Sequence, residues 1–147
     1  MDRIVVGIDG SMNSVRALRW ALGESKAHHA TIEAVICWSY PMMPADGFSG
    51  MAAMIDPSAF QEAASQTLEA AIAKACPETE ANTAIKRSIV EGSAGQTLIE
   101  ASRDADLLVV GSRGHGGFAG LLLGSVSTQC VHHARCPITV VPPDTQD

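Results

Sequence analysis

The chain has 147 residues, 46% of them hydrophobic, which is enough for the core of one domain spanning residues 1–147 and too little for two. Sixteen Asp and Glu residues against ten Lys and Arg give a net charge of -6, which argues against a general nucleic-acid or anionic-membrane surface. The first apolar run, residues 4–8, is too short for a signal-peptide core or a membrane span, so we expect a cytoplasmic protein.

The first part of the chain predicts two buried strands with a helix between them. Residues 4–8 form a short apolar run, and a turn then leads to a helix capped by either Ser11 or Asn13. Residues 32–38 are almost continuously apolar. Such a run is typical of a central parallel strand that is covered on both faces.

A long segment without a regular period follows the second strand. Residues 39–57 contain prolines, glycines and several methionines, so we expect a flexible loop. This loop either covers a ligand or a partner, or it is a variable insertion, and both interpretations stay open. Asp56 and Pro57 predict the start of the next helix, which ends near Pro77.

The next elements are a polar strand, a helix and a buried strand. Residues 84–90 are more polar than the first two strands, as an edge strand would be. Residues 93–96 form a capping-box pattern that predicts the start of a helix. Residues 107–110 are a continuous apolar run and predict another buried strand.

The last part of the chain completes the alternation of strands and helices. Ser125 is expected to cap a helix over residues 126–133, and Ile138–Val141 predicts a final strand before a polar tail over residues 142–147. Strand and helix thus alternate five times. This pattern is typical of an open, doubly wound parallel α/β sheet with right-handed crossovers and helices on both faces.

The four cysteines do not form a recognisable pattern. They include no CxxC pair and have no regular spacing, so the sequence predicts neither a disulfide framework nor a zinc site. We expect them to be small buried side chains: Cys37, Cys76, Cys130 and Cys136.

A glycine-rich stretch after the fourth predicted strand is the candidate functional element. It has glycines at positions 111, 114, 116, 117, 120 and 124, and the N-terminus of a helix follows it, which together favour an anion site. Arg113 and His115 add possible side-chain donors. If the first and fourth strands are neighbours, Asp9 faces the same site, and a nucleotide fits that geometry. The alternatives are a flexible turn that binds nothing and an Asp9 that is only a turn or cap residue.

Several catalytic and nucleotide motifs are absent from the sequence. The stretch has no lysine and is therefore not a Walker A loop, and its GxxGxG order differs from the dinucleotide fingerprint. No GxSxG elbow is present, which gives a hydrolase triad little support. Phosphoryl transfer would require a lysine or paired metal carboxylates at the phosphates. The sequence therefore indicates binding more clearly than catalysis.

The chain resembles the single-domain, ATP-binding type of the universal stress protein family over nearly its full length. The family signature G-2x-G-9x-G-(S/T) is matched by Gly111, Gly114, Gly124 and Ser125. Residues 6–11 and 131–141 are similar to the first and last strands of the family. The resemblance implies an adenine-nucleotide alpha-hydrolase-like sheet of order 3-2-1-4-5, with ATP across the ends of the first and fourth strands.

The resemblance also implies roles for individual residues. Asp9 would lie near the ribose or a Mg²⁺ ion bound through the nucleotide, Gly7 near the adenosine, and the backbone of Cys37 at the adenine. The residues that would wrap the ribose and phosphates are Gly111, Ser112, Arg113, Gly114, His115, Gly116, Gly117, Gly124, Ser125, Val126 and Ser127. A homodimer through Ile138–Val141 is implied as well, and an exposed edge strand is suited to such pairing.

We therefore expect an ATP-binding stress-response or signalling protein with at most slow ATP hydrolysis and an unidentified protein partner. One alternative is an enzyme of the same fold that uses ATP for adenylyl transfer, which would be expected to contain an SGGxDS or HxGH motif. Neither motif is present. The other alternative is a dimeric scaffold whose site takes no ligand.

Overall fold

The computed structural model describes residues 1–40, 56–79, 81, 84–115 and 122–145. Its centre is a five-stranded sheet of order β3-β2-β1-β4-β5 in which all neighbouring strands are parallel. The predicted doubly wound sheet and its strand order are confirmed. The strands are β1 (Arg3–Ile8), β2 (Thr31–Trp38), β3 (Lys86–Glu91), β4 (Leu107–Gly111) and β5 (Ile138–Val141).

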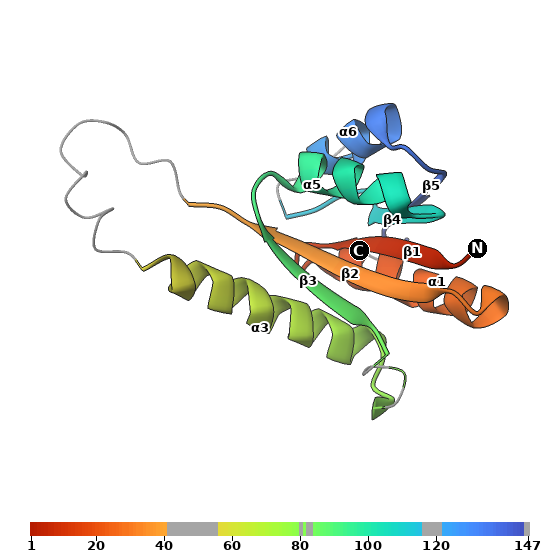
Figure 1. Ribbon diagram of the computed structural model, residues 1–147, viewed down its shortest axis with the longest axis horizontal. Helices are drawn as coiled ribbons and strands as arrows, with labels where there is room; N and C mark the ends of the chain where they lie inside the picture. Colours follow the sequence, from red (N-terminus) through yellow and green to blue (C-terminus); the bar gives the residue numbers. More distant parts are fainter. Residues whose placement is uncertain (41–55, 80, 82–83, 116–121, 146–147) are drawn as a thin grey trace.

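Helices cover both faces of the sheet (Figure 1). On one face, α1 packs beside α3, and on the other face α5 packs beside α6. A short 3₁₀ helix, η1, connects α5 to β4. The helical elements are α1 (Met12–His28), α3 (Pro57–Ala75), α5 (Ala94–Ala101), η1 (Ser102–Asp104) and α6 (Ser125–His133).

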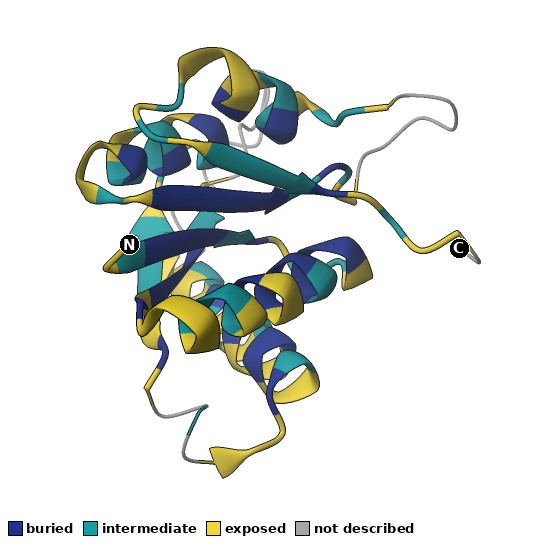
Figure 2. Cartoon of the chain, turned by 90° about the vertical axis from the view of Figure 1, so that its right-hand side faces the viewer, coloured by how far each residue is buried: buried dark blue, intermediate teal, exposed yellow. Residues whose placement is uncertain are grey.

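The central strands are buried on both faces because alternate side chains of a strand point in opposite directions. On β1, Ile4 and Val6 belong to the core under α1 and α3, whereas Val5 belongs to the core under α5 and α6. In Figure 2 the central strands are dark blue, while the helices are yellow on their outer side. Of the predicted small buried cysteines, Cys76 and Cys130 are buried, but Cys37 and Cys136 are only half-buried.

Two predicted helix starts are confirmed, and the choice left open at α1 is decided. Ser11 is the N-cap of α1, and its Oγ accepts a hydrogen bond from Ser14 N at 3.2 Å. Asn13 lies inside the helix and bonds elsewhere. Asp56 caps α3 by accepting a bond from Ser58 N at 3.0 Å, with Pro57 as the first helical residue.

Of two other predicted caps, the one at Ser93 is confirmed in position and the one at Ser125 is wrong. Ser93 precedes α5 as expected, but its side chain makes no capping hydrogen bond in the described part of the chain. At α6 the N-cap is Gly124, and Ser125 is already the first helical residue. The reason is tertiary: Gly124 N donates to Ser112 O at 2.6 Å, which starts the helix one residue earlier than the sequence pattern predicts.

Parts of two predicted loops lie outside the described residues. The flexible loop predicted over residues 39–57 includes residues 41–55, which are not described. Of the glycine-rich stretch, residues 116–121 are not described. β3 is an edge strand, as predicted, although it begins at Lys86 rather than at residue 84.

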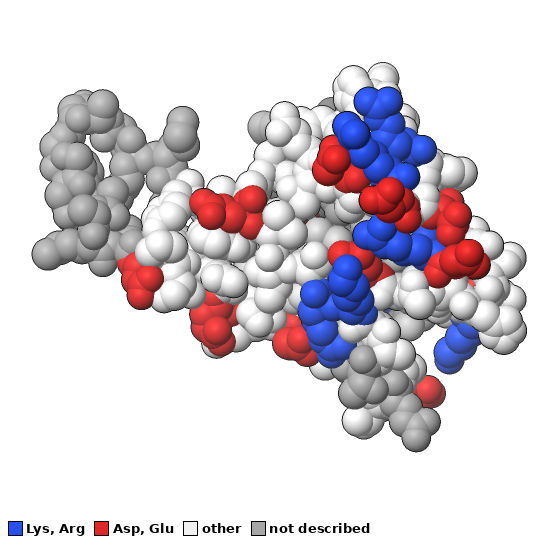
Figure 3. Space-filling view, in the orientation of Figure 1, with Lys and Arg blue, Asp and Glu red and all other residues white. Residues whose placement is uncertain are grey.

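The charged surface is mixed rather than uniformly basic. On the face in Figure 3, the Lys and Arg side chains gather toward one end and lie among Asp and Glu side chains. Ion pairs such as Arg87 with Glu69 and Arg103 with Glu100 are part of this pattern. In the described part of the chain, no helix combines the length and the apolar character needed to cross a bilayer.

Glu33 is a buried carboxylate that joins three strands. Its Oε2 lies 2.7 Å from Arg3 Nη2 on β1 and 3.3 Å from Lys86 Nζ on β3. Burial raises the pKa of Glu33, but the hydrogen bonds from Arg3 and Lys86 outweigh it and hold the pKa below its ordinary value of 4.5. The ionised form therefore stabilises the fold.

We expect Glu33→Gln to lower the free energy of unfolding by about 1–3 kcal/mol at pH 7, because the amide loses the charge-assisted bonds. Because the pKa is lower in the folded chain, this contribution is complete above the unfolded-state pKa and is lost as the pH falls through the folded-state value. Urea unfolding of both proteins between pH 7 and pH 3 measures the difference. A difference that stays constant down to pH 3 would show that ionisation of Glu33 does not stabilise the fold.

Candidate functional site

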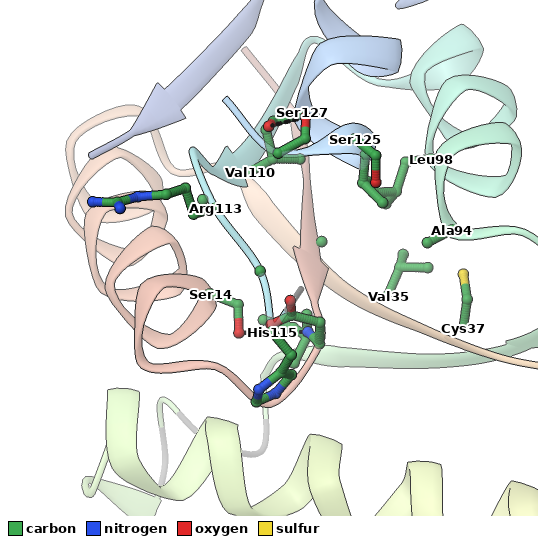
Figure 4. Close-up of a pocket in the computed structure, with 17 residues that line it drawn as sticks. Ser14, Val35, Cys37, Ala94, Leu98, Val110, Arg113, His115, Ser125 and Ser127 are labelled. Carbon is green, nitrogen blue, oxygen red and sulfur yellow. Dashed lines mark hydrogen bonds between the residues drawn. The ribbon is translucent and has the colours of Figure 1, made fainter. Parts of the chain in front are cut away.

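A cavity of about 350 Å³ opens at the carboxyl ends of β1 and β4 (Figure 4). The two strands are neighbours, with Val6 opposite Val109. From β1 the chain continues to α1 on one face of the sheet, and from β4 it continues toward α6 on the other face. The cavity thus lies where the strand order reverses, which is the usual ligand position in an open α/β sheet.

One side of the cavity is apolar. It is lined by Val35 and Cys37 of β2, Leu98 of α5 and Val110 of β4. Burial raises the pKa of the Cys37 thiol, and a hydrogen bond with Thr97 opposes this only in part. The thiol is therefore neutral at pH 7, and this side of the cavity suits an uncharged, flat group.

The other side of the cavity is lined by glycines and by the first turn of a helix. Gly111 and Gly114 line it from the end of β4, and Ser125, Val126 and Ser127 line it from the first turn of α6. The first N–H groups of a helix have no acceptor within the helix, and they carry the positive end of its dipole. This side therefore suits an anionic group.

Asp9 lies at the junction of the two loops that form the site. Its Oδ1 accepts hydrogen bonds from Ser11 N at 2.9 Å and Ser11 Oγ at 2.5 Å. Gly10, with a φ of 84°, permits the tight turn between them. The second oxygen, Oδ2, lies beside Gly114, where an added Cβ would overlap with it. Asp9 is thus a turn residue through Oδ1 and a cavity residue through Oδ2.

Gly7 keeps β1 close to α5 at the apolar side of the cavity. A Cβ on Gly7 would lie 2.8 Å from Leu98 Cδ1. Any side chain here would push Leu98 away from the strand or occupy part of the cavity. The glycine therefore defines the width of the apolar side.

Most of the predicted binding residues come together in this cavity. Ser112 is not among the lining residues: it is buried, and its carbonyl accepts bonds from Gly124 N and Ser127 Oγ. Gly116 and Gly117 lie outside the described residues. Arg113 lines the cavity, but its side chain points away from Cys37 and Leu98 in Figure 4. The predicted residues that line it are Gly7, Asp9, Cys37, Gly111, Arg113, Gly114, His115, Gly124, Ser125, Val126 and Ser127.

Several lining residues are absent from the sequence prediction. Most are apolar, and hydrophobic periodicity assigns such residues to the core without separating cavity walls from packed interior. Ser14 is the exception: its hydroxyl donates to Ser11 O at 2.8 Å, and only its place in the first turn of the helix that follows Asp9 signals a role. The residues in question are Ile8, Ser14, Val35, Ala94, Leu98 and Val110.

The cavity has few groups that could hold a metal ion. Among the described residues, no group of three or more His, Cys, Asp and Glu side chains is arranged as a metal site. Asp9 is the one carboxylate among the lining residues. A hard cation such as Mg²⁺ would therefore need further oxygen ligands from water or from a bound phosphate.

A family model and the sequences of known proteins both match this chain. A model of the universal stress protein family matches residues 1–142. A universal stress protein of Mycolicibacterium smegmatis is 37% identical over 148 residues, and one of Mycobacterium tuberculosis is 36% identical over 137 residues. These matches cover 97% and 93% of this chain but 49% and 44% of the relatives. The chain thus spans about half the length of the curated relatives it matches.

Solved structures of similar fold include universal stress protein UspA from Lactobacillus plantarum, with a TM-score of 0.78 at 19% identity over 95% of this chain and 97% of that one. A universal stress protein in complex with cAMP has a TM-score of 0.59 at 28% identity, covering 95% and 96% of the two chains. An Arabidopsis thaliana family member with AMP bound has a TM-score of 0.66 at 20% identity, covering 99% and 94%. The family model over residues 1–142 and the curated relatives at 36–37% identity show that the chain belongs to the universal stress protein family.

Proposed function

We propose that this protein binds ATP with Mg²⁺ in the cavity between β1 and β4, and that it acts in the cytoplasm as a nucleotide-dependent stress-response or signalling protein. The observation that carries the proposal is that one cavity has an apolar side and a side of glycine backbone and helix N-terminus. An adenine ring suits the first and phosphates suit the second. The cavity volume of about 350 Å³ is large enough for most of a nucleotide.

Two structural neighbours support an adenine nucleotide as the ligand. One is described as a complex with cAMP and another as having AMP bound. Both ligands share adenosine with ATP and differ in the phosphates. We therefore assign the adenosine to the side lined by Val35, Cys37 and Leu98, and we expect the phosphate side to decide between the nucleotides.

The residues of the phosphate side fit a triphosphate with its cation. Gly114 leaves open the space beside Asp9 Oδ2 that a Cβ would fill. Asp9 would hold the cation or the ribose, and the backbone at Gly114 and at Ser125 to Ser127 would bind the phosphates. The cation, when bound, neutralises phosphate charge.

The same residues favour holding the nucleotide over hydrolysing it. Among the described residues that line the cavity there is no lysine, and Asp9 is the one carboxylate. Fast phosphoryl transfer normally needs a lysine or paired metal carboxylates at the phosphates. We therefore propose slow hydrolysis at most. An adenylyl-transferring enzyme and a dimeric scaffold that binds no ligand remain the alternatives.

We also propose a homodimer that pairs through β5. This strand lies at the edge of the sheet, and Ile138, Thr139 and Val140 are only half-buried. An apolar, unpaired edge is suited to pairing with a second copy. Sedimentation at several protein concentrations measures the oligomeric state.

Isothermal titration of nucleotide-free protein with ATP-Mg tests the nucleotide proposal. We expect one saturable site per chain, with ATP-Mg binding more tightly than AMP because only ATP fills the phosphate side. Cys37→Trp, which fills the apolar side from a half-buried position, is the negative control and should bind neither nucleotide. No heat at millimolar ATP-Mg with a folded wild-type protein would refute the proposal.

A further inference from the structure

Asn13 connects two distant parts of the chain through one buried side chain. It is only 9% exposed in the first turn of α1. Its Nδ2 donates a hydrogen bond to Val141 O at the end of β5, at 3.0 Å. Its Oδ1 accepts bonds from Arg113 N at 3.0 Å and from Ser112 Oγ at 3.3 Å. Because one partner is a carbonyl and another an N–H, the position requires a side chain that both donates and accepts.

Ser112 extends this network to the first turn of α6. Its N–H donates to Val141 O at 2.8 Å. Its carbonyl accepts bonds from Gly124 N at 2.6 Å and from Ser127 Oγ at 2.9 Å. The end of β4, the end of β5 and the start of α6 therefore share one set of hydrogen bonds, and Asn13 is the member contributed by α1.

Asn13 also packs closely against the end of β4. A Cβ on Gly111 would lie 3.0 Å from Asn13 Cγ and 3.1 Å from its backbone C and O. The first turn of α1 thus rests directly on the end of β4. Asn13 is not among the cavity-lining residues, so any effect on a ligand passes through its neighbours, which include Gly111, Ser112 and Arg113.

We propose that Asn13 is a positioning residue for the phosphate side of the cavity: by holding Arg113 N and Ser112 Oγ, it sets the backbone of residues 111–114 against the first turn of α6. This inference rests on the proposed nucleotide site. It assigns Asn13 no contact with the ligand and no role at the apolar side. Loss of its amide should therefore weaken binding of phosphates and leave binding of the nucleoside unchanged.

Titration of Asn13→Ala with ATP-Mg and with adenosine tests this inference. We expect the affinity for ATP-Mg to fall at least about tenfold and the affinity for adenosine to change less than about twofold. The reason is that the substitution displaces the backbone of residues 111–114, which in this proposal contacts only the phosphates. A merely structural role would reduce both affinities together or neither. Amide hydrogen exchange at Arg113 should become faster in the same variant, because this N–H loses its acceptor.

Two further variants keep the test interpretable. Asp144→Asn removes a different contact between α1 and the C-terminal part of the chain, the 2.7 Å pair of Arg16 Nη1 with Asp144 Oδ2, and should leave both affinities unchanged. If Asn13→Ala does not fold, Ser112→Ala removes only the 3.3 Å bond into Oδ1. It should then give a smaller loss of ATP-Mg affinity with adenosine unaffected.

The outcomes separate this inference from the proposed function. If the folded wild type binds neither ATP-Mg nor adenosine, the proposed function fails and the role of Asn13 fails with it. If the wild type binds ATP-Mg and Asn13→Ala binds it equally well, only the positioning role is overturned. Equal losses for ATP-Mg and adenosine in Asn13→Ala would also overturn it, since they would indicate general damage to the site.

Discussion

Gly114→Ala is expected to lower the affinity for ATP-Mg by about tenfold or more and to lower the free energy of unfolding by only about 1 kcal/mol, through the bonds between Asp9 and Ser11. An added Cβ would overlap with Asp9 Oδ2. Asp9 cannot simply turn aside, because its Oδ1 is held by Ser11 N and Ser11 Oγ. The substitution therefore displaces the Asp9 carboxylate and fills the space proposed for the phosphates.

A double-mutant cycle with Asp9→Ala tests this mechanism. If the collision with Asp9 causes the loss, Gly114→Ala should cost little further affinity once Asp9 has been replaced. Gly124→Ala is the matched comparison, because its Cβ would approach neighbouring atoms only to an ordinary 3.6 Å. A loss of affinity in that variant would come from the ligand itself. Wild-type affinity in both glycine variants would refute the phosphate cradle.

Gly111→Ala should instead destabilise the whole fold, by about 1–3 kcal/mol in urea unfolding. Its Cβ would lie 3.0 to 3.1 Å from atoms of Asn13, and two of these atoms belong to the backbone of α1. Backbone in the first turn of a packed helix cannot move away as a side-chain end can. Gly111, the first glycine of the signature, is thus required because α1 packs directly against it. Gly114, the second, is required because a side chain there would fill space in the cavity.

Gly23→Ala, in the helix against which Gly111 packs, provides the control for Gly111→Ala. Gly23 lies within α1, and apart from the helix's own neighbouring backbone nothing is within 4 Å of its added Cβ. Alanine should therefore stabilise the protein here, by about 0.5–1 kcal/mol, through its better helix propensity. A Gly111→Ala protein as stable as the wild type would show that α1 and β4 have more room than the structure indicates.

The sheet could be predicted from the sequence because its central strands are buried on both faces. The runs at residues 4–8, 32–38 and 107–110 are continuous and apolar, and the structure places β1, β2 and β4 there. The polar run at residues 84–90 correctly indicates an edge strand, β3. In these cases the local sequence pattern and the burial in the folded chain both favour a strand.

The site could be predicted only where backbone requirements leave a trace in the sequence. Gly111, Gly114, Gly124 and the turn at Asp9 are such traces, and they line the cavity. Val35 and Leu98 are ordinary core residues by their pattern, so their position at a cavity could not be inferred. The cap at Ser125 is wrong because a bond between Gly124 and Ser112, twelve positions away in sequence, decides where α6 begins.

Asn13 illustrates what local reasoning cannot reach. In the sequence it is one of two possible caps for α1, and helix rules alone do not exclude either. In the structure its amide bonds groups that are 128, 100 and 99 positions away in the chain. Only the assembled sheet brings these groups together, so the role of Asn13 follows from topology and not from spacing.

The hydrogen bonds from Gly124 N and Ser127 Oγ to Ser112 O hold together the two ends of the segment that runs from residue 112 to residue 124. Both anchors lie within the folded body, so extra residues placed between them would lengthen the loop without separating them. Loop-closure entropy rises slowly with length, by about 0.6 kcal/mol for each doubling. An epitope inserted between the anchors should thus leave the sheet intact.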